Sequence, residues 1–371
     1  MRIGILVPGF SSHPDDWAIP VQQNLARELA ASDDLRMIAL RYPHRRDCYT
    51  IEGATVYSLG VGQVRGALRL RLWWDALRLI ERLHHEKPFD VLHAMWADET
   101  GLITGWAGRC LGIPVVVSIL GGELVGLGDI RYGLQRSAFS RWIVRQALNG
   151  ADRIIVPSNY VRRLVSAHSV PDEKIVSISL GVDAERFTPS ATPPDPRRLI
   201  HVASLVPVKD QATLLKAFAL LDKSVTLDIL GEGSEHAKLE ALAHELSIHE
   251  RVRFIGAVAH PDLPHHYQQA AINLLSSRHE TIAMTTLEAA ACGVPTISTS
   301  VGIVPDYLSL GLSVPVGDAA ALAQTIQALL DDPERRAALG RSARATAEHD
   351  LSIKVTAQQL RSLYVELRGK T

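Results

Sequence analysis

The chain has 371 residues, of which 47% are hydrophobic and 21% are charged. This length favours two domains, and this composition excludes a chain that is disordered throughout. Lys plus Arg total 39 against 40 for Asp plus Glu, so the formal net charge is -1. A nucleic-acid partner therefore has no overall electrostatic support.

The cysteine pattern and the N-terminal segment both indicate a reducing compartment. Cys48, Cys110 and Cys292 are widely separated and form no CxxC pair. This spacing argues against a disulfide framework or a zinc site. The N-terminal segment MRIGILVPGF has only a short apolar run before Gly and Pro. We therefore expect a buried strand rather than a signal peptide, no membrane-spanning helix, and a cytoplasmic protein.

In the first half of the chain, short runs of Val, Ile and Leu alternate with helical periods. This alternation is typical of a parallel sheet that is covered on both faces. The predicted strands are 3–7, 36–40, 91–93, 115–119 and 153–156. The predicted helices are 20–31, 67–85, 100–111 and 137–149.

A proline-rich segment, 187–197, predicts a semi-rigid linker, after which the alternation restarts. The predicted strands are then 199–203, 226–230, 252–255, 272–275 and 295–298. The predicted helices are 211–221, 235–246, 264–269, 287–292, 319–330, 333–348 and a long amphipathic one at 352–367. The fold class is therefore α/β, with two Rossmann-like doubly wound domains that face each other across a cleft and bind ligands at the carboxyl ends of their strands.

Two glutamates eight positions apart, Glu280 and Glu288, flank the predicted start of the helix 287–292. Thr285 is the predicted N-cap of this helix, and Glu288 follows it at the spacing of a capping box. A helix N-terminus carries partial positive charge and free N–H groups, so the segment suits a phosphorylated, hydroxyl-rich ligand. The alternative is that Glu288 only caps its helix and Glu280 is a solvated loop carboxylate.

An ordered set of motifs resembles the family 4 retaining, nucleotide-sugar-dependent glycosyltransferases, which have the two-Rossmann GT-B architecture. The motifs are ADRIIVPSNYVRRLV, SLGVDAERFTP, HVASLVPVKDQATLLKAF, LDILGEGSEHAKLE, VRFIGAV, RHETIAMTTLEAAACGVP, GIVPDYL and PVGDAAALAQTIQALLDDPE. The resemblance covers nearly the whole chain. It implies an acceptor-side domain at 1–183, a linker at 184–197, a donor-binding domain at 198–350 and a helix at 351–371 that crosses back to the first domain.

The resemblance also implies roles for individual residues of the donor domain. Lys209 would meet the donor diphosphate as a point charge, and Glu280 would lie beside the transferred sugar, so both are expected to be catalytic. Glu288 would pair with the ribose hydroxyls. The family commonly has an Arg where this chain has Ser204, whose hydroxyl could still donate a hydrogen bond.

A second departure from the family lies between the two glutamates. Thr281-Ile282-Ala283 stands where the family usually has Gly-Phe-Gly, so a positive φ at Thr281 or Ala283 would be costly. Either the loop takes a different path, or the N–H groups of Ala283, Met284 and Thr285 are the backbone donors to the phosphates.

The resemblance places the acceptor side in the first half of the chain. Many members have a His before the glycines that follow strand 115–119, and this chain has Leu120 instead. Gly121 and Gly122 still allow close approach of a ligand to the backbone, and Glu123 is expected to bind hydroxyls. Further candidate contacts follow strand 3–7, namely Gly9, Ser11, Ser12, His13, Asp15 and Asp16. The adjacent aspartates lack a metal-binding spacing and equally fit a helix start, so no metal site is expected.

The segment 65–85 predicts a basic amphipathic helix. Its apolar stripe consists of Leu68, Leu72, Ala76, Leu79 or Ile80, and Leu83. Elsewhere on the helix lie Trp73, Trp74, Arg65, Arg69, Arg71, Arg78 and Arg82. Such a helix can lie on an anionic membrane surface. The alternative is a helix that packs on its own sheet and exposes a solvated arginine face.

The sequence therefore predicts a retaining glycosyltransferase that moves a sugar from a nucleotide diphosphate-sugar to an acceptor hydroxyl, with no cofactor. The acceptor would be a glycan, a lipid-linked molecule or a small molecule. The protein would be cytoplasmic, and residues 65–85 would be its contact if it binds the inner face of the membrane. Two alternatives stay open. One is an inactive nucleotide-sugar-binding partner subunit, favoured by the departures at Leu120, Ser204 and 281–283, and the other is a GT-B epimerase or phosphorylase.

Overall fold

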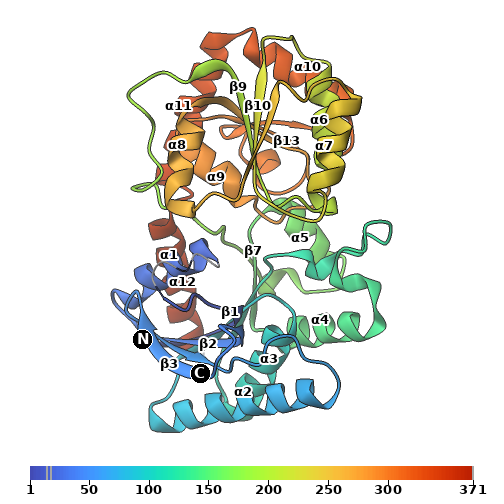
Figure 1. Cartoon of the computed structure of the whole chain (residues 1–371). Coiled ribbons are helices and arrows are strands. Elements are labelled where there is room, and N and C mark those ends of the chain that lie inside the picture. Colours follow the sequence, from blue (N-terminus) through green and yellow to red (C-terminus); the bar gives the residue numbers. More distant parts are fainter. Residues whose placement is uncertain (14–15, 17–18, 370–371) are drawn as a thin grey trace. The chain divides into compact units, whose positions relative to one another are not determined.

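The computed structural model of the chain describes residues 1–13, 16 and 19–369 (Figure 1). The chain forms two compact units. Unit 1 contains residues 1–179 together with the chain from Ile353 onward, and unit 2 contains residues 180–352. The sequence predicts boundaries near residues 183 and 350. The segment 184–197, which the sequence predicts as a separate linker, lies within unit 2.

Unit 1 is built on a sheet that has eight strands in the described part of the chain, in the order β3-β4-β2-β1-β5-β6-β7-β8. Neighbouring strands are parallel except β3 and β4, which form an antiparallel pair. The strands are β1 (Arg2–Gly9), β2 (Asp34–Tyr42), β3 (Asp47–Ile51), β4 (Ala54–Ser58), β5 (Val91–Met95), β6 (Val115–Ser118), β7 (Arg153–Val156) and β8 (Ile175–Ser177).

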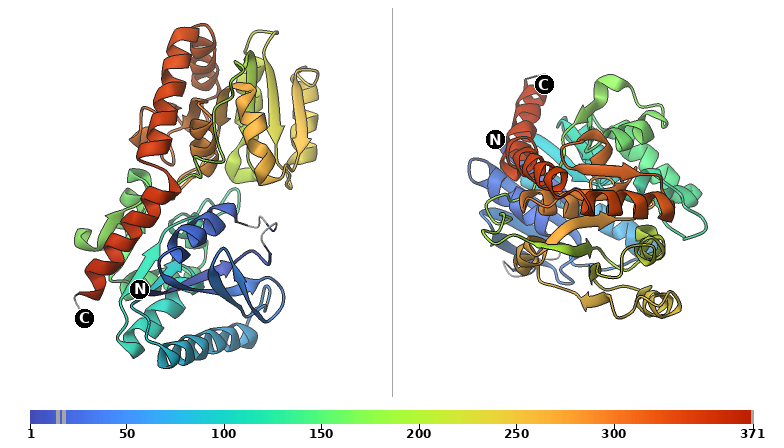
Figure 2. Two further views of the ribbon diagram at one scale, coloured as in Figure 1. Left: turned by 90° about the vertical axis from the view of Figure 1, so that its left-hand side faces the viewer. Right: turned by 90° about the horizontal axis from the view of Figure 1, so that it is seen from above.

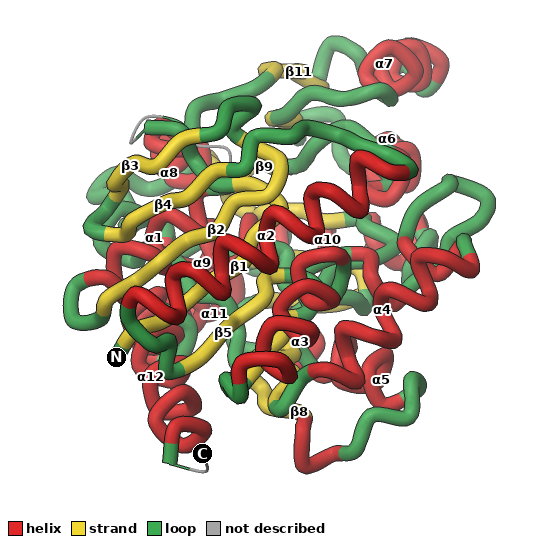
Figure 3. The backbone as a smooth tube through the Cα atoms, turned by 90° about the horizontal axis from the view of Figure 1, so that it is seen from below, coloured by secondary structure: helices red, strands yellow, loops and turns green. Residues whose placement is uncertain are grey.

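Helices cover both faces of this sheet. They are α1 (Pro20–Ala30), α2 (Ala67–Glu86), α3 (Glu99–Leu111), α4 (Ala138–Gly150), α5 (Asn159–Ser166) and α12 (Ile353–Arg368). Figure 3 shows α2, α3 and α4 on one face, where their apolar residues pack with those of β1, β2, β5 and β6. Asp98 and Ser137 begin α3 and α4 as N-caps, each accepting a hydrogen bond from a backbone N–H of the first turn.

Unit 2 has a fully parallel sheet, with six strands among the described residues in the order β11-β10-β9-β12-β13-β14. The strands are β9 (Asp195–Val202), β10 (Thr226–Leu230), β11 (Val252–Gly256), β12 (Ala270–Leu275), β13 (Thr296–Thr299) and β14 (Gly311–Val314). Because parallel strands point the same way, the loops after all of them meet at one edge of the sheet.

Two separate apolar cores lie on the two faces of the unit 2 sheet. The core on one face takes its side chains from α6 (Gln211–Ala219), α7 (His236–Glu245) and α10 (Ala319–Leu330). The core on the other face takes them from α8 (Leu263–Gln268), α9 (Met284–Ala291) and α11 (Pro333–His349). Figure 1 shows these two helical layers on opposite sides of the strands. The predicted α/β class with two parallel-sheet units is confirmed.

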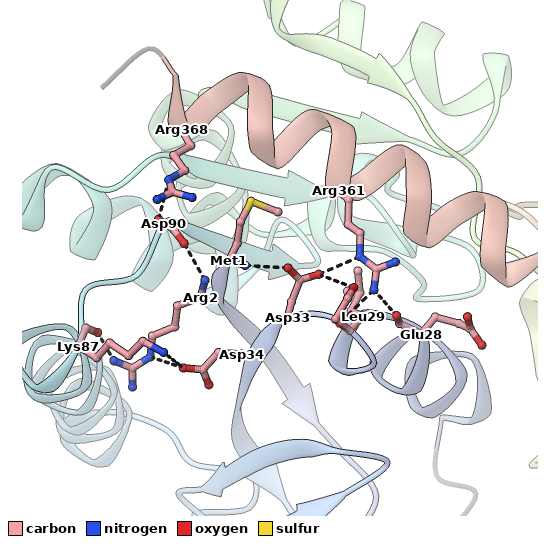
Figure 4. Close-up of polar contacts among 11 residues, drawn as sticks. Met1, Arg2, Glu28, Leu29, Asp33, Asp34, Lys87, Asp90, Arg361 and Arg368 are labelled. Atoms are coloured by element: carbon pink, nitrogen blue, oxygen red, sulfur yellow. Dashed lines mark hydrogen bonds and ion pairs between the residues drawn. The ribbon is translucent and has the colours of Figure 1, made fainter.

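The last helix, α12, belongs to unit 1 and contacts α1 and β5 (Figure 2). Its buried apolar residues are Ile353, Ala357, Leu360, Leu363, Tyr364 and Leu367. Arg361 Nε lies 2.8 Å from Asp33 Oδ2, and the Met1 amino group lies 2.9 Å from Asp33 Oδ1 (Figure 4). Burial acts to raise the pKa of Asp33, but the hydrogen bonds to the Met1 amino group and Arg361 outweigh it and lower that pKa.

A buried polar chain also ties α12 to the centre of the sheet. His93 on β5 has Nδ1 2.6 Å from the Tyr364 hydroxyl and Nε2 2.8 Å from Ser118 Oγ. Burial lowers the pKa of His93 to about 3, so the imidazole is neutral at physiological pH. Both ring nitrogens are hydrogen-bonded, which is what a buried imidazole requires.

Helix α2 differs from its predicted apolar stripe. The buried residues are Leu72, Trp73, Ala76, Ile80 and Leu83, whereas Leu68 is 57% exposed. The sequence therefore misplaces the start of the stripe, because Trp73 enters the core and stacks on Phe139 of α4.

Within the described residues, none of the helices combines the length and the apolar character needed to span a bilayer.

Four strands are not predicted from the sequence, and each has a local reason. The β3–β4 hairpin turns at Glu52-Gly53, both with positive φ, but a Glu in the first position gives no turn signal. The strand β8 has only three residues, too few for a periodic pattern, and β14 (GLSV) contains a Gly and a Ser that weaken its strand signal.

Candidate functional site

Two loops at the carboxyl edge of the unit 2 sheet bring Lys209 and Glu280 together. Lys209 ends a single 3-10 turn after β9, and Glu280 lies in the loop after β12. Lys209 Nζ is 2.5 Å from Glu280 Oε1, and Ser277 Oγ donates to the same oxygen at 2.6 Å. The Ser276 hydroxyl donates to the Lys209 carbonyl at 2.8 Å. The ammonium and the carboxylate stay 24% and 12% exposed, so both can reach a ligand at this edge.

The chain enters α9 through a strained residue. Ala283 is the N-cap of α9 with φ 66 and ψ 79, in the left-handed region, and its side chain makes no capping bond. The prediction that Thr285 caps this helix is wrong, because Thr285 is its second residue. The predicted cost at a lost glycine is present at Ala283 and amounts to ~1–2 kcal/mol for a residue with a Cβ.

The start of α9 offers free backbone donors beside the Lys209–Glu280 loops. Met284 and Thr285 are the first two residues of the helix, so their N–H groups have no acceptor within it. These amides and the helix dipole make this end of α9 electropositive. The helix N-terminus and the Lys209 ammonium are therefore two sources of positive charge within one set of loops.

Glu288 lies in the second turn of α9, is 6% exposed and does not cap the helix. Its Oε1 lies 2.9 Å from His260 Nε2, and its Oε2 accepts a hydrogen bond from the Tyr267 hydroxyl at 3.0 Å. Burial and the nearby carboxylate raise the pKa of Tyr267, which keeps the phenol as a donor. The capping-box interpretation of Glu288 is wrong, because the helix begins at Met284 and places Glu288 beyond its first turn.

His260 and Tyr267 are functional candidates that sequence reasoning missed. They precede Glu288 by 28 and 21 residues and come from the 3-10 turn His260–Asp262 and from α8. Neither residue has a spacing signal that points to Glu288. Only the packing of α8 against α9 brings them together.

The loop that carries Ser204 is held by a buried pair behind it. Gln211 Nε2 lies 3.1 Å from the Ser204 carbonyl and 3.2 Å from His201 Nε2, and His201 Nδ1 lies 2.8 Å from the Leu274 carbonyl. Burial lowers the pKa of His201 to about 4, so the ring is neutral, with Nδ1 as donor and Nε2 as acceptor. The Ser204 side chain itself is exposed.

In unit 1, the loop after β1 uses most of its predicted contact groups internally. Asp16 Oδ2 accepts hydrogen bonds at 2.7 Å from the Ser12 amide, the Ser12 hydroxyl and the Tyr42 hydroxyl. Ser11 is 1% exposed, so its side chain faces the interior. A Cβ on Gly9 would lie 2.9 Å from Tyr42 Cβ, so only glycine fits there. Asp15, predicted as a further contact, lies outside the described residues.

Glu123 holds the loop after β6 from inside unit 1. It is 2% exposed and accepts hydrogen bonds from the amides of Gly121 at 2.7 Å, Leu120 at 3.1 Å and Ala97 at 3.4 Å. Burial raises the pKa of Glu123 to about 7, against the opposite effect of the amides. Glu123 therefore contacts the protein backbone, where the sequence predicts contacts to ligand hydroxyls, while Gly121 and Gly122 are partly exposed.

No group of three or more His, Cys, Asp or Glu side chains in the described ranges is placed to hold a metal ion.

Family profiles match the two halves of the chain in succession. The Glycosyl transferase 4-like domain matches residues 19–181, and Glycosyl transferases group 1 matches residues 183–346. The chain is 27% identical to D-inositol 3-phosphate glycosyltransferase of Kineococcus radiotolerans, over 84% of this chain and 83% of that protein. It is 30% identical to a GDP-mannose-dependent mannosyltransferase of Corynebacterium glutamicum that acts on a monoacylated phosphatidylinositol monomannoside, over 60% of this chain and 65% of that protein.

Solved structures show the same fold. Sucrose-phosphate synthase of Thermosynechococcus elongatus superposes with a TM-score of 0.81 at 22% identity and full coverage of both chains. Anabaena HepE in complex with UDP gives 0.76 at 18% identity, covering 99% of this chain and 100% of that one. These two similarities show that the chain has the GT-B fold.

The protein belongs to the GT4-type glycosyltransferases and has the GT-B fold. It is an enzyme that transfers a glycosyl group from a nucleotide sugar.

The strain at Ala283 can be measured. Ala283→Gly removes the left-handed penalty but adds the conformational entropy of a glycine, ~0.5–1 kcal/mol, to the unfolded chain. We expect the free energy of unfolding to rise by up to about 1 kcal/mol in urea titrations. Ala337→Gly, on an exposed part of α11, is the matched control and should lower it by about 1 kcal/mol. Equal losses for both variants would contradict the strain at Ala283.

Proposed function

We propose that the enzyme transfers its sugar with retention of the anomeric configuration, from a nucleoside diphosphate-sugar bound by unit 2 to an acceptor hydroxyl bound by unit 1. The observation that supports this most directly is the Lys209–Glu280 pair beside the N-terminus of α9. We also propose that the reaction needs no metal ion and takes place in the cytoplasm. The family resemblance supports retention.

Neutralising the leaving diphosphate is the main catalytic contribution in this proposal. Lys209 is a compact point charge and the amides of Met284 and Thr285 are fixed dipoles, so both act on charge as it develops on the phosphates. The Lys209 ammonium has three N–H donors, and its contact with Glu280 uses one of them. The others are available for phosphate oxygens. The hydrogen bond from Gln211 Nε2 to the Ser204 carbonyl keeps the preceding loop in place.

The two glutamates bind the hydroxyls of the donor. Glu280 is oriented by Lys209 and Ser277, so its second oxygen, Oε2, can accept from a sugar hydroxyl. Glu288 uses one lone pair of each oxygen for His260 and Tyr267, and a carboxylate oxygen can accept a second hydrogen bond. A ribose diol, with two adjacent donors, matches a carboxylate that is held in this way.

The acceptor class follows from the relatives. Their acceptors are a phosphorylated cyclitol and a lipid-linked cyclitol glycoside. We therefore propose an acceptor that carries a cyclic polyol or sugar hydroxyl, free or attached to a lipid. The donor base stays open between uracil and guanine, since one neighbour was solved with UDP and one relative uses GDP-mannose.

The reaction is tested with a panel of UDP-, GDP- and ADP-sugars and pooled cyclitol, glycoside and lipid-linked acceptors, with EDTA present. Mass spectrometry should show one donor-dependent glycoside, and NMR should show the anomeric configuration of the donor in that product. An inverted product would refute retention. Activity that disappears with EDTA and returns with a divalent metal would refute the metal-independent reaction.

Lys209 is tested by binding. Lys209→Ala should weaken binding of the cognate nucleoside diphosphate about tenfold to a hundredfold, because a charge-assisted contact is lost, and leave nucleoside binding unchanged. Lys223→Ala, which removes an exposed lysine of the same unit, is the control and should change neither affinity in calorimetry. Equal losses for both ligands in Lys209→Ala would remove Lys209 from the diphosphate site.

We further propose that the exposed face of α2 contacts an anionic membrane. Leu70 and Trp74 lie one helical turn apart and are 62% and 57% exposed. The Arg78 guanidinium lies 4.9 Å from the centre of the Trp74 ring, and Arg71 is exposed beside them. Exposed apolar side chains among arginines suit a lipid interface. Arg69 is not part of this surface, because it pairs with Glu99 at 2.8 Å.

Vesicle sedimentation tests this surface. The protein should sediment with phosphatidylglycerol vesicles and not with phosphatidylcholine vesicles, and salt should weaken the binding. Arg71→Glu with Arg78→Glu should reduce it at least about tenfold, since each cation near the surface contributes ~1 kcal/mol. Arg335→Glu with Arg341→Glu makes the same charge change on exposed residues of unit 2 and should have little effect. If the protein stays in the supernatant at low salt, the membrane proposal is refuted and the exposed face of α2 is simply solvated.

A further inference from the structure

Trp96 has a backbone conformation that a tryptophan rarely adopts. It follows directly after β5 and has φ 80, in the left-handed region that favours glycine. A bulky side chain there is strained, and such strain persists only where the surroundings over-determine it. Trp96 is also only partly buried, so packing in the core does not account for it.

The surroundings of Trp96 hold this conformation from three sides. Its N–H donates to the Ser118 carbonyl at 3.0 Å, and its own carbonyl accepts from Thr100 Oγ1 at 2.9 Å. The next amide, that of Ala97, donates to buried Glu123. A Cβ on Gly101 would lie 3.2 Å from the Trp96 carbonyl, so α3 approaches this carbonyl through a glycine. The strained residue is therefore clamped between β6, α3 and the loop after β6.

Two glycines of the loop after β6 lie directly against two aromatic rings. A Cβ on Gly121 would lie 3.1 Å from Trp96 Nε1, and a Cβ on Gly122 would lie 2.9 Å from the Tyr132 ring. All four residues are partly exposed. These four residues make up the candidate surface, in which each aromatic ring lies against one of two adjacent glycines.

Buried Glu123 holds the backbone of this surface from the interior of unit 1. Its carboxylate accepts from the amides of Leu120 and Gly121, and its own carbonyl accepts from Gln135 Nε2 at 2.7 Å. The same carboxylate reaches Ala97, which follows Trp96. One buried group therefore joins the segment that carries Trp96 to the segment that carries the glycines, and this rigidity suits a binding surface.

We propose that Trp96, Gly121, Gly122 and Tyr132 form an acceptor subsite on unit 1 that takes the flat face of a pyranose or cyclitol ring. The assignment rests on the proposed acceptor role of unit 1. The face of an aromatic ring is electron-rich and attracts the polarised C–H groups on the face of a cyclic polyol. The glycines let the ring come close to the backbone, and the hydroxyls at its rim stay free to form hydrogen bonds.

The subsite is tested with cyclic and open-chain probes on the full-length protein. In saturation-transfer NMR, methyl α-D-mannopyranoside and myo-inositol should receive saturation at their ring C–H protons, and the open-chain polyol mannitol should receive much less. Trp96→Leu keeps an apolar side chain without the aromatic face and should weaken binding of the cyclic probes about tenfold. Phe139→Leu, which removes another exposed aromatic side chain of the same unit, should leave their binding unchanged.

Trp96→Gly keeps the test informative if the leucine variant is unstable, because glycine adopts φ 80 without strain. The unfolding temperature of this variant should be no lower than that of the parent protein, and the variant should still fail to bind the cyclic probes. Unchanged probe binding in a folded Trp96 variant, equal binding of mannitol, or no binding of either cyclic probe to the parent protein would overturn the subsite.

Calorimetry with UDP and GDP on the same proteins separates this subsite from the proposed donor site. Failure of both nucleotides to bind the parent protein would count against the donor proposal alone, because the cyclic probes report on unit 1. Nucleotide binding that survives in Trp96→Gly, together with lost probe binding, is the expected result.

Discussion

The contact between Lys209 and Glu280 depends on the way in which the unit 2 sheet is built. The two residues are 71 positions apart, yet their side chains meet at 2.5 Å because β9 and β12 are neighbouring parallel strands. Loops that follow neighbouring parallel strands emerge at the same edge. Several other parts of the candidate donor site lie beside this pair: Ser277 contacts Glu280, Ser276 donates to the Lys209 carbonyl, and α9 begins shortly after Glu280. The sheet thus brings the positive charge of Lys209 and the negative charge of Glu280 together from two segments that are distant in sequence.

Buried polar groups hold the loops of both units in place. In unit 2, neutral His201 and Gln211 hold the Ser204 loop, while His260 and Tyr267 orient Glu288. In unit 1, Glu123 takes up three backbone amides. An unpaired buried polar group is costly, so each of these contacts strongly restricts the conformation of its loop. The strained backbones of Ala283 and Trp96 lie next to such loops, where the surrounding hydrogen bonds stabilise them.

These features explain how a chain that departs from its family at several positions keeps the family's overall arrangement. Ala283 adopts a left-handed backbone at a position where the family usually has glycine, so the start of α9 is kept at a cost in strain. Leu120 provides no imidazole, but its amide contributes to the loop through Glu123. The acceptor subsite that we propose therefore relies on backbone and aromatic side chains more than on an additional polar side chain.

The sequence by itself determined the α/β class and most helices to within a few residues, and it indicated Lys209, Glu280 and Glu288 as candidate site residues. These signals are local, because periodic apolar residues, turn residues and short motifs can be recognised within one segment. The tertiary structure decided what each group touches. It showed that Thr285 does not cap α9, that Glu123 is buried, and that His260 and Tyr267 contact Glu288. It also revealed the left-handed backbone of Trp96 and its place beside Gly121. Such contacts join segments that are distant in sequence, and they arise only when strands pair and helices pack, so no local pattern encodes them.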